Sequence, residues 1–152
     1  MLTNTDLKQE HGFTLIEVLL VLSLVSLLVT IPVLNFTRMK EETETQLFFE
    51  SLRSGITLIQ NEAIVNDHWT LMEVRPRNRL IRFRVTGANN GAHPANHILY
   101  LPDSVSLVGT ATEYSFSRGS GNLGNFIGIG FNTIHGRVNV SFQIGSGRFV
   151  IQ

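Results

Sequence analysis

The run of residues from Phe13 to Phe36 constrains the fold of this chain more than any other feature. It holds 24 predominantly apolar residues, and as a helix rising about 1.5 Å per residue it would be about 36 Å long. The hydrocarbon core of a bilayer is about 30 Å thick, so the run predicts a membrane-spanning helix. One carboxylate, Glu17, lies inside it. An ionisable group in a membrane segment is costly unless it is paired, which makes Glu17 a candidate functional residue.

A polar leader, residues 1–12, ends in Gly12 directly before the apolar run. Secretory signals carry an apolar region of about 7–15 residues and are cleaved after it, whereas here the processing-like junction, Gly12-Phe13, comes before the run. Cleavage there would place the new α-amino group of Phe13 in the same helical turn as Glu17. In a bundle of staggered helices, that ammonium could pair with Glu17 of a neighbouring subunit and fix the axial register. The alternative is that the helix dipole alone satisfies Glu17.

The string Gly12-Phe13-Thr14-Leu15-Ile16-Glu17 resembles the processing motif of the type IV pilin superfamily, position for position. The resemblance implies cleavage after Gly12 by a prepilin peptidase, N-methylation of Phe13, and assembly with other pilins through Phe13 and Glu17. It also implies the orientation of the chain, with the leader in the cytoplasm and the carboxy-terminal head outside the membrane.

Residues 40–66 predict a continuation of the helix, because they contain no proline and only one glycine. Apolar residues recur there at spacings of three and four, which is the period of one helix face. The members of this stripe are Phe48, Leu52, Ile56, Ile59 and Ala63. We expect the stripe to face a core and Asn66-Asp67 to close the helix.

From Trp69 onward the pattern changes to short strands. Strands are predicted around residues 81–85, 98–101, 105–108, 113–117, 126–131, 137–144 and 148–151, with loops at 86–96 and 119–124 and a turn at Gly145-Ser146-Gly147. A long helix followed by short strands predicts an α+β fold, in which the soluble half of the helix packs on an antiparallel β-sheet. The expected organisation is a leader at 1–12, a transmembrane or filament-core helix at 13–36, and a pilin-like head at 37–152.

Sequence patterns that would indicate catalysis or cofactor binding are weak. The chain has no cysteine, which excludes disulfides, thiol nucleophiles and cysteine-based zinc sites. Residues 119–124 match G-x-G-x-x-G, but strand-like sequence follows where a nucleotide site needs a helix. His93 and His97 have a zinc-like spacing, yet they flank Pro94 in a loop with no acidic residue close in sequence. We therefore predict no metal, no cofactor and no enzymatic activity.

Charge is distributed unevenly along a chain whose formal net charge is zero. Residues 40–73 contain seven acidic and two basic side chains, whereas residues 74–152 contain eight arginines and two acidic side chains. Five of these arginines lie within ten residues: Arg75, Arg77, Arg79, Arg82 and Arg84. They could contact the phosphates of double-stranded DNA without reading its sequence. Alternatively, they form a solvated hairpin face that pairs with the acidic stems of neighbouring subunits.

The head also resembles one branch of the superfamily. The segment Gln60-Asn61-Glu62-Ala63-Ile64, the strands that run to the chain end and the turn Gly145-Ser146-Gly147-Arg148 are similar to those of competence pseudopilins, and more loosely to H-type pseudopilins of type II secretion. The first resemblance implies a minor subunit of a DNA-uptake pseudopilus for natural transformation, anchored in the cell membrane with its head extracellular. Alternatives are a type II secretion pseudopilin for protein export and a single-pass membrane protein whose head binds an extracellular ligand.

Overall fold

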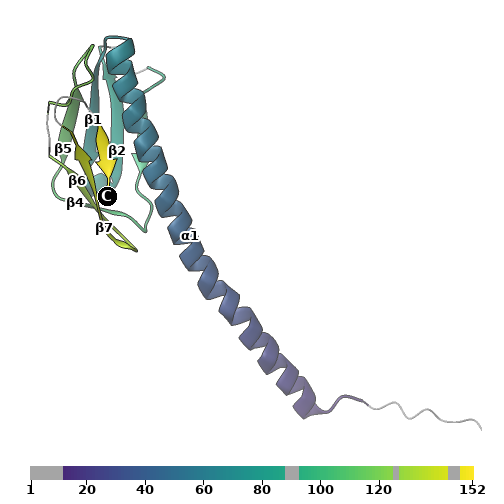
Figure 1. Ribbon diagram of the computed structural model, residues 1–152. Helices are drawn as coiled ribbons and strands as arrows, with labels where there is room; N and C mark the ends of the chain where they lie inside the picture. Colours follow the sequence, from purple (N-terminus) through teal and green to yellow (C-terminus); the bar gives the residue numbers. More distant parts are fainter. Residues whose placement is uncertain (1–11, 88–92, 125–126, 144–147) are drawn as a thin grey trace, which may run out of the picture. The chain divides into compact units, whose positions relative to one another are not determined.

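The computed structural model describes residues 12–87, 93–124, 127–143 and 148–152 (Figure 1). The predicted leader up to residue 11, the beginning of the strand predicted at 126–131 and the predicted turn at 145–147 lie outside the described residues. The chain divides into two compact units, Met1–Arg38 and Met39–Gln152. They are described separately below.

Helix α1, Leu15–Val65, contributes residues to both units. Thr14 precedes its first turn, and the Thr14 hydroxyl oxygen accepts a hydrogen bond of 3.3 Å from the backbone N–H of Glu17. A threonine hydroxyl in this position caps a helix by satisfying a free amide of the first turn. The helix closes where it was predicted to close, because Asp67 adopts a left-handed conformation with φ of 54°.

In the first unit, the apolar side chains of α1 between Leu15 and Val29 are exposed. The hydroxyl groups in this stretch are satisfied within the helix: those of Ser23, Ser26 and Thr30 donate to the carbonyls of Leu20, Leu22 and Ser26 over 2.7–2.8 Å. The sequence led us to expect a membrane span over residues 13–36. Across the described residues, however, no helix has the length and apolarity needed to traverse a bilayer.

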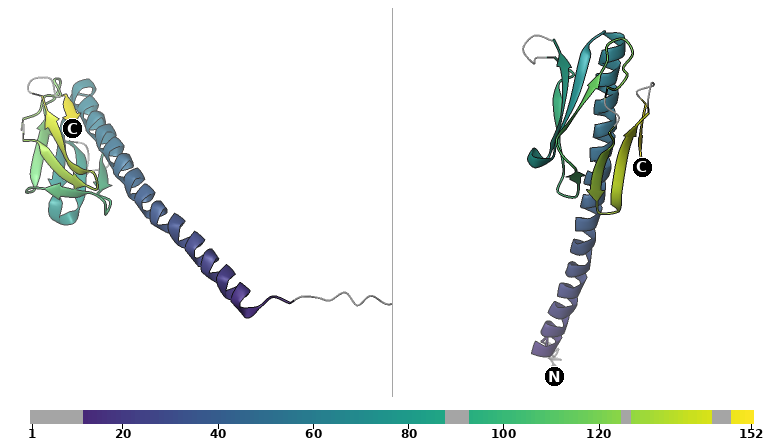
Figure 2. Two further views of the ribbon diagram at one scale, coloured as in Figure 1. Left: turned by 60° about the horizontal axis from the view of Figure 1, so that its bottom comes forward. Right: turned by 90° about the vertical axis from the view of Figure 1, so that its left-hand side faces the viewer.

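In its described residues, the second unit carries eight strands in two antiparallel sheets rather than the single sheet that the sequence predicted. One sheet has the order β3-β2-β1-β5 and the other β4-β6-β7-β8; the right-hand view of Figure 2 separates them. The strands are β1 Trp69–Arg75, β2 Leu80–Thr86, β3 His97–Tyr100, β4 Ser106–Val108, β5 Thr112–Phe116, β6 Ile129–Thr133, β7 Gly136–Phe142 and β8 Phe149–Ile151, with a 3-10 turn, η1, at Pro76–Asn78.

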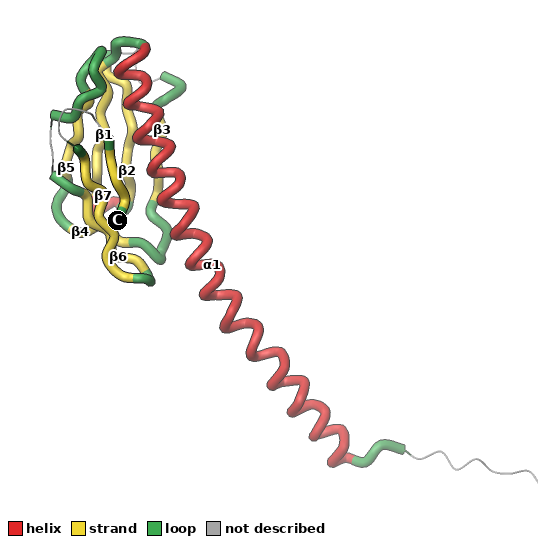
Figure 3. The backbone as a smooth tube through the Cα atoms, in the orientation of Figure 1, coloured by secondary structure: helices red, strands yellow, loops and turns green. Residues whose placement is uncertain are grey.

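The core of the head lies between the two sheets and the part of α1 that follows residue 38 (Figure 3). All five residues of the predicted helical stripe are buried, so that prediction is confirmed. Phe131 on β6 packs its ring edge-on against Phe48 and Phe49 of α1, with ring centroids 5.6 and 5.5 Å apart. Phe142 on β7 contacts Tyr114 on β5, with centroids 5.4 Å apart, and so joins the two sheets. One continuous core therefore holds the head together.

Candidate functional site

The processing and assembly residues lie at the exposed beginning of α1. Phe13 is 83% exposed, and Gly12 and Glu17 are also exposed. Glu17 lies in the first helical turn, where the positive end of the helix dipole stabilises a carboxylate. Two interpretations of Glu17 therefore stay predictions: it pairs with the Phe13 ammonium of a neighbouring subunit, or the helix dipole alone satisfies it. An accessible Gly12-Phe13 bond and an accessible Glu17 meet what processing and assembly require.

The arginine group lies on β1, η1 and β2, and the pairing of these strands decides what most of it contacts. Glu73 on β1 lies directly opposite Arg82 on β2. Alternate residues of a strand share one face, so Arg75 and Arg84 flank the same carboxylate. Three guanidinium groups therefore converge on Glu73, at 3.1 Å for Arg75, 3.6 Å for Arg82 and 3.4 Å for Arg84. The Glu73 side chain is only 5% exposed.

Burial alone would raise the pKa of Glu73, but its arginine partners outweigh that effect and lower the pKa below its ordinary value. The hydrogen bond and positive charge of Arg75 contribute most, followed by Arg84 and Arg82. Arg75 also reaches Glu113 on β5 over 2.9 Å. This Glu73 cluster therefore ties β2, β1 and β5 together on the outer face of their sheet. The sequence placed Glu73 in an acidic stem and missed this role.

The other two arginines have different surroundings. Arg79 adopts a left-handed conformation with φ of 52°, and its guanidinium donates to the carbonyl of Pro102 over 2.8 Å and lies 3.4 Å from Asp103. Arg77 is exposed on η1, and in the described parts of the chain it is the one arginine of the group for which no ion pair is found.

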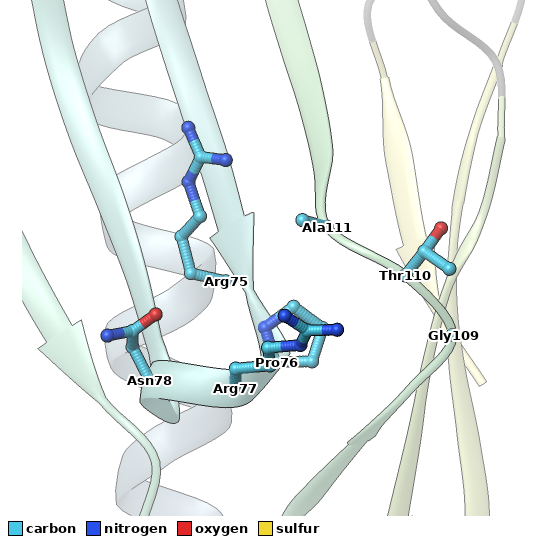
Figure 4. Close-up of a pocket in the computed structure, with 7 residues that line it drawn as sticks. All are labelled: Arg75, Pro76, Arg77, Asn78, Gly109, Thr110 and Ala111. Carbon is cyan, nitrogen blue, oxygen red and sulfur yellow. The ribbon is translucent and has the colours of Figure 1, made fainter.

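A hollow of about 470 Å³ lies beside Arg77, between the η1 turn and the connection from β4 to β5. Its lining consists of Arg75, Pro76, Arg77, Asn78, Gly109, Thr110 and Ala111 (Figure 4). In Figure 4 the Arg75 side chain extends away from the η1 turn, and its guanidinium pairs with Glu73 and Glu113. Within the described part of the head, Arg77 thus supplies positive charge without an ion-pair partner at this end of the hairpin.

Three arginines and two glutamates make up the Glu73 cluster, which leaves a net charge of +1 (3 − 2). Five unpaired guanidinium groups would attract a phosphate backbone strongly, but most of this charge is neutralised inside the head. The alternative drawn from the sequence was an arginine face that pairs with the acidic stems of neighbouring subunits. In the structure, acidic partners of most of these arginines belong to the same chain. DNA contact stays a prediction.

Replacing Glu73 by glutamine is expected to lower the free energy of unfolding by about 2 kcal/mol near neutral pH, because three guanidinium groups then face a neutral amide. The lowered pKa makes this stabilisation depend on pH. It is present above the ordinary pKa of 4.5 and is lost as the pH falls through the lower pKa of the folded chain. Urea unfolding of the full chain in detergent, between about pH 7 and about pH 2, should show the two proteins converging in stability.

Glu113→Gln is the matched control, because Glu113 is 55% exposed, whereas Glu73 is buried among its arginine partners. Exposed pairs contribute little, so its effect should be smaller and should vary less with pH. Equal stability of wild type and Glu73→Gln across the whole pH range would contradict the role given to the cluster.

The histidines are arranged differently from the sequence-based expectation. His97 stacks on Phe83 of the core, with ring centroids 4.4 Å apart, and its Nδ1 lies 2.8 Å from the carbonyl oxygen of Ala95. His93 instead lies close to His68 and to Glu62, whose carboxylate is 3.8 Å from His93 Nε2. No acidic residue lies close to His93 along the sequence, but the fold brings Glu62 to it from the last turns of α1.

The G-x-G-x-x-G segment covers the end of α1. The backbone N–H of Gly119 donates to the carbonyl of Ala63 over 2.8 Å, which satisfies one of the free carbonyls of the last helical turn. Gly121 has φ of 61°, and a Cβ there would come within 2.7 Å of the Ile64 side chain. Both a left-handed backbone and close packing therefore favour glycine at this position.

Comparison with known proteins supports the class of protein that the amino-terminal residues indicate. Residues 7–31 match the family model of the prokaryotic N-terminal methylation motif. No curated protein and no solved structure matches the chain. The motif, together with an α+β fold in which a long amino-terminal helix packs on antiparallel sheets, supports a type IV pilin-like or pseudopilin subunit. Such a subunit is processed by a prepilin peptidase and assembles with other pilins, and the motif is typical of membrane-anchored proteins.

Proposed function

We propose that this chain is a minor pseudopilin of a competence pseudopilus, most like ComGD, which serves DNA uptake in natural transformation. The observation that carries the proposal is the N-terminal methylation motif at residues 7–31, with Phe13 and Glu17 accessible at the start of a long helix. The competence role, rather than protein export by type II secretion, is supported by the resemblance of residues 60–64 and of the carboxy-terminal strands to competence pseudopilins.

The exposed apolar side chains of α1 supply the physical basis for anchoring and assembly. Contiguous apolar surface of this extent is unfavourable in water and is covered by lipid or by a partner. In the proposed cycle, residues 13–36 anchor the subunit in the cell membrane with its head extracellular. The same residues later form the core of a filament at the cell surface, packed against the equivalent helices of other pseudopilins.

Glu17 has a specific task in that apolar surrounding. A carboxylate removed from water needs an opposite charge, and cleavage after Gly12 creates one on Phe13. The neighbouring subunit's Phe13 ammonium pairs with Glu17, so the register of each incoming subunit is fixed by one ion pair. The chain has no enzymatic task in this cycle.

The first test compares transformation frequency and protein export in the native host after deletion of the gene. Restoring the wild-type gene should recover transformation, whereas Glu17→Leu should behave like the deletion because the unpaired ammonium blocks assembly. Glu50→Leu is the control, since Glu50 is an exposed carboxylate on the head portion of α1. Normal transformation with impaired export would replace the competence role by type II secretion.

A second test examines the mature amino terminus by mass spectrometry. Cleavage after Gly12 and N-methylation of Phe13 are expected in wild type and in Glu50→Leu. An intact leader on a stable membrane protein would instead support a single-pass protein whose head binds an extracellular ligand, and would remove the filament role altogether.

Direct DNA contact is best tested at Arg77. Charge reversal at Arg82 and Arg84 would place new carboxylates beside Glu73 and disturb the head. Arg77→Glu leaves the Glu73 cluster intact, because Arg77 lies on the exposed η1 turn. If the head binds DNA through this turn, Arg77→Glu lowers transformation while subunit assembly stays normal. Unchanged transformation would contradict DNA binding through this turn.

A further inference from the structure

Three side chains from separate segments meet near the end of α1. Figure 3 shows the course of the backbone there. Glu62 belongs to the last turns of α1, His68 lies between α1 and β1, and His93 lies shortly before β3. Oε2 of Glu62 is 3.5 Å from Nδ1 of His68 and 3.8 Å from Nε2 of His93. The ligand atoms of all three residues lie within 4.8 Å of one another.

We propose that Glu62, His68 and His93 bind a divalent transition metal ion, for which Zn²⁺ is the best fit. In a tetrahedral zinc site with bonds of about 2.0–2.1 Å, neighbouring ligand atoms are about 3.3–3.4 Å apart. The two distances from Glu62 already approach that value, so small side-chain rotations complete the geometry. Two imidazole nitrogens and one carboxylate oxygen suit zinc and other late transition metals, whereas Ca²⁺ and Mg²⁺ prefer oxygen ligands alone.

The hydrogen bonding of the cluster leaves a place for the ion. Nδ1 of His68 is a buried atom with no hydrogen-bond partner among the described residues, although Glu62 lies nearby. Buried polar atoms are nearly always paired, and a metal ion would supply the missing partner. Nδ2 of Asn66 donates to Glu62 Oε2 over 2.8 Å. A hydrogen bond of this kind orients a ligating carboxylate.

Solvent reaches the proposed site. The Glu62 side chain is 17% exposed and that of His68 is 41% exposed, so water can occupy a fourth position on the ion.

Binding exchanges one contact of His93 for another. The backbone N–H of Ala95 donates to Nδ1 of His93 over 3.2 Å, so the neutral ring carries its proton on Nε2, which faces Glu62. A metal ion on Nε2 moves that proton to Nδ1, and the amide of Ala95 loses its acceptor. One hydrogen bond is thus replaced by a metal–nitrogen bond, which is the stronger interaction.

The ion would link the end of α1, the connection to β1 and the segment before β3. Because an ion held by three distant segments binds the folded chain and not the unfolded one, it stabilises the fold. This role goes beyond the proposed function and does not depend on it. A competence pseudopilin, a type II secretion pseudopilin or a membrane protein with a ligand-binding head could all be stabilised by the same ion.

The test titrates the full chain in detergent, first stripped with a chelator, with Zn²⁺ in a calorimeter and with Co²⁺ in an absorption spectrometer. We expect one ion per chain, a tetrahedral Co²⁺ spectrum and a melting temperature that rises with Zn²⁺. Glu62→Gln, His68→Gln and His93→Gln should each weaken binding by at least about tenfold, and Asn66→Ala should weaken it by about tenfold through the orientation of Glu62.

His135→Gln is the matched control, because His135 also lies 3.8 Å from a carboxylate, that of Glu42, but belongs to no three-ligand cluster among the described residues. It should leave zinc affinity unchanged. Circular dichroism of the metal-free variants separates loss of a ligand from loss of the fold, and His93→Gln suffices if His68→Gln does not fold. Absence of zinc binding in wild type, or equal binding by wild type and folded His93→Gln, would overturn the proposal.

Discussion

Replacing Phe131 by alanine is expected to lower the free energy of unfolding of the head by about 3–5 kcal/mol. Phe131 is fully buried, and its ring contacts both Phe48 and Phe49 edge-on. It is therefore a main contact between the second sheet and α1. Removing the ring loses the free energy of its transfer from water and leaves a cavity that β6, paired on both sides, cannot collapse to fill. Urea unfolding of the full chain in detergent measures the loss.

Ile134→Ala serves as the control, because Ile134 lies directly after β6 and is exposed. Its effect should stay within about 0.5 kcal/mol. If Phe131→Ala cost no more than Ile134→Ala, the second sheet would not be held to the helix through Phe131, and the described core would be wrong at this point.

Replacing Gly55 by leucine is expected to lower the free energy of unfolding by about 3 kcal/mol, since the added atoms overpack the core. A Cβ at this position would come within 2.8 Å of Cζ of Phe83 and 2.9 Å of Nε2 of His97. Phe83 is fully buried and stacked on His97, so its ring cannot withdraw. Even Gly55→Ala should be destabilising, although alanine is intrinsically the better helix former by about 1 kcal/mol.

Ser54→Leu is the matched control for Gly55→Leu, because Ser54 is the preceding residue of α1 and is exposed. It should change stability by less than about 0.5 kcal/mol. The double variant Gly55→Ala/Phe83→Leu should lose less than the sum of its two single variants, since the smaller side chain makes room for the new methyl group. If the losses in the free energy of unfolding were strictly additive, the side chains at positions 55 and 83 would not compete for the same space.

The elements of the fold that depend on local patterns could be read from the sequence. The buried face of α1 follows from the spacing of Phe48, Leu52 and Ile56, because helical period is a property of neighbouring turns. The existence of most strands followed in the same way. The division into two sheets did not, because β1 pairs with β5 across 36 intervening residues, 76 to 111, and short strands carry little information about their distant partners.

The same difference between local patterns and distant contacts applies to the candidate functional residues. The Gly12-Phe13 junction and Glu17 form a continuous motif, so the sequence alone identified them. The pairing of Glu73 with Arg82 could also have been inferred, because the turn at residues 76–79 predicts a hairpin that places them opposite each other. Nothing local connects His93 to Glu62, which lies 31 residues earlier. That contact exists because β2 returns the chain to the end of α1, where Thr86 lies opposite Trp69.

The hydroxyl groups of Ser23, Ser26 and Thr30 can keep the same hydrogen bonds when a subunit passes from lipid into a filament. Each hydroxyl donates to a carbonyl of its own helix, so this bonding is complete in either surrounding. Apolar side chains likewise find lipid tails and neighbouring helices nearly equivalent. In the proposed cycle, the transfer therefore changes the partners of two charged groups, Glu17 and the Phe13 ammonium. The balance between membrane-anchored and assembled subunits then depends on the ion pair between them.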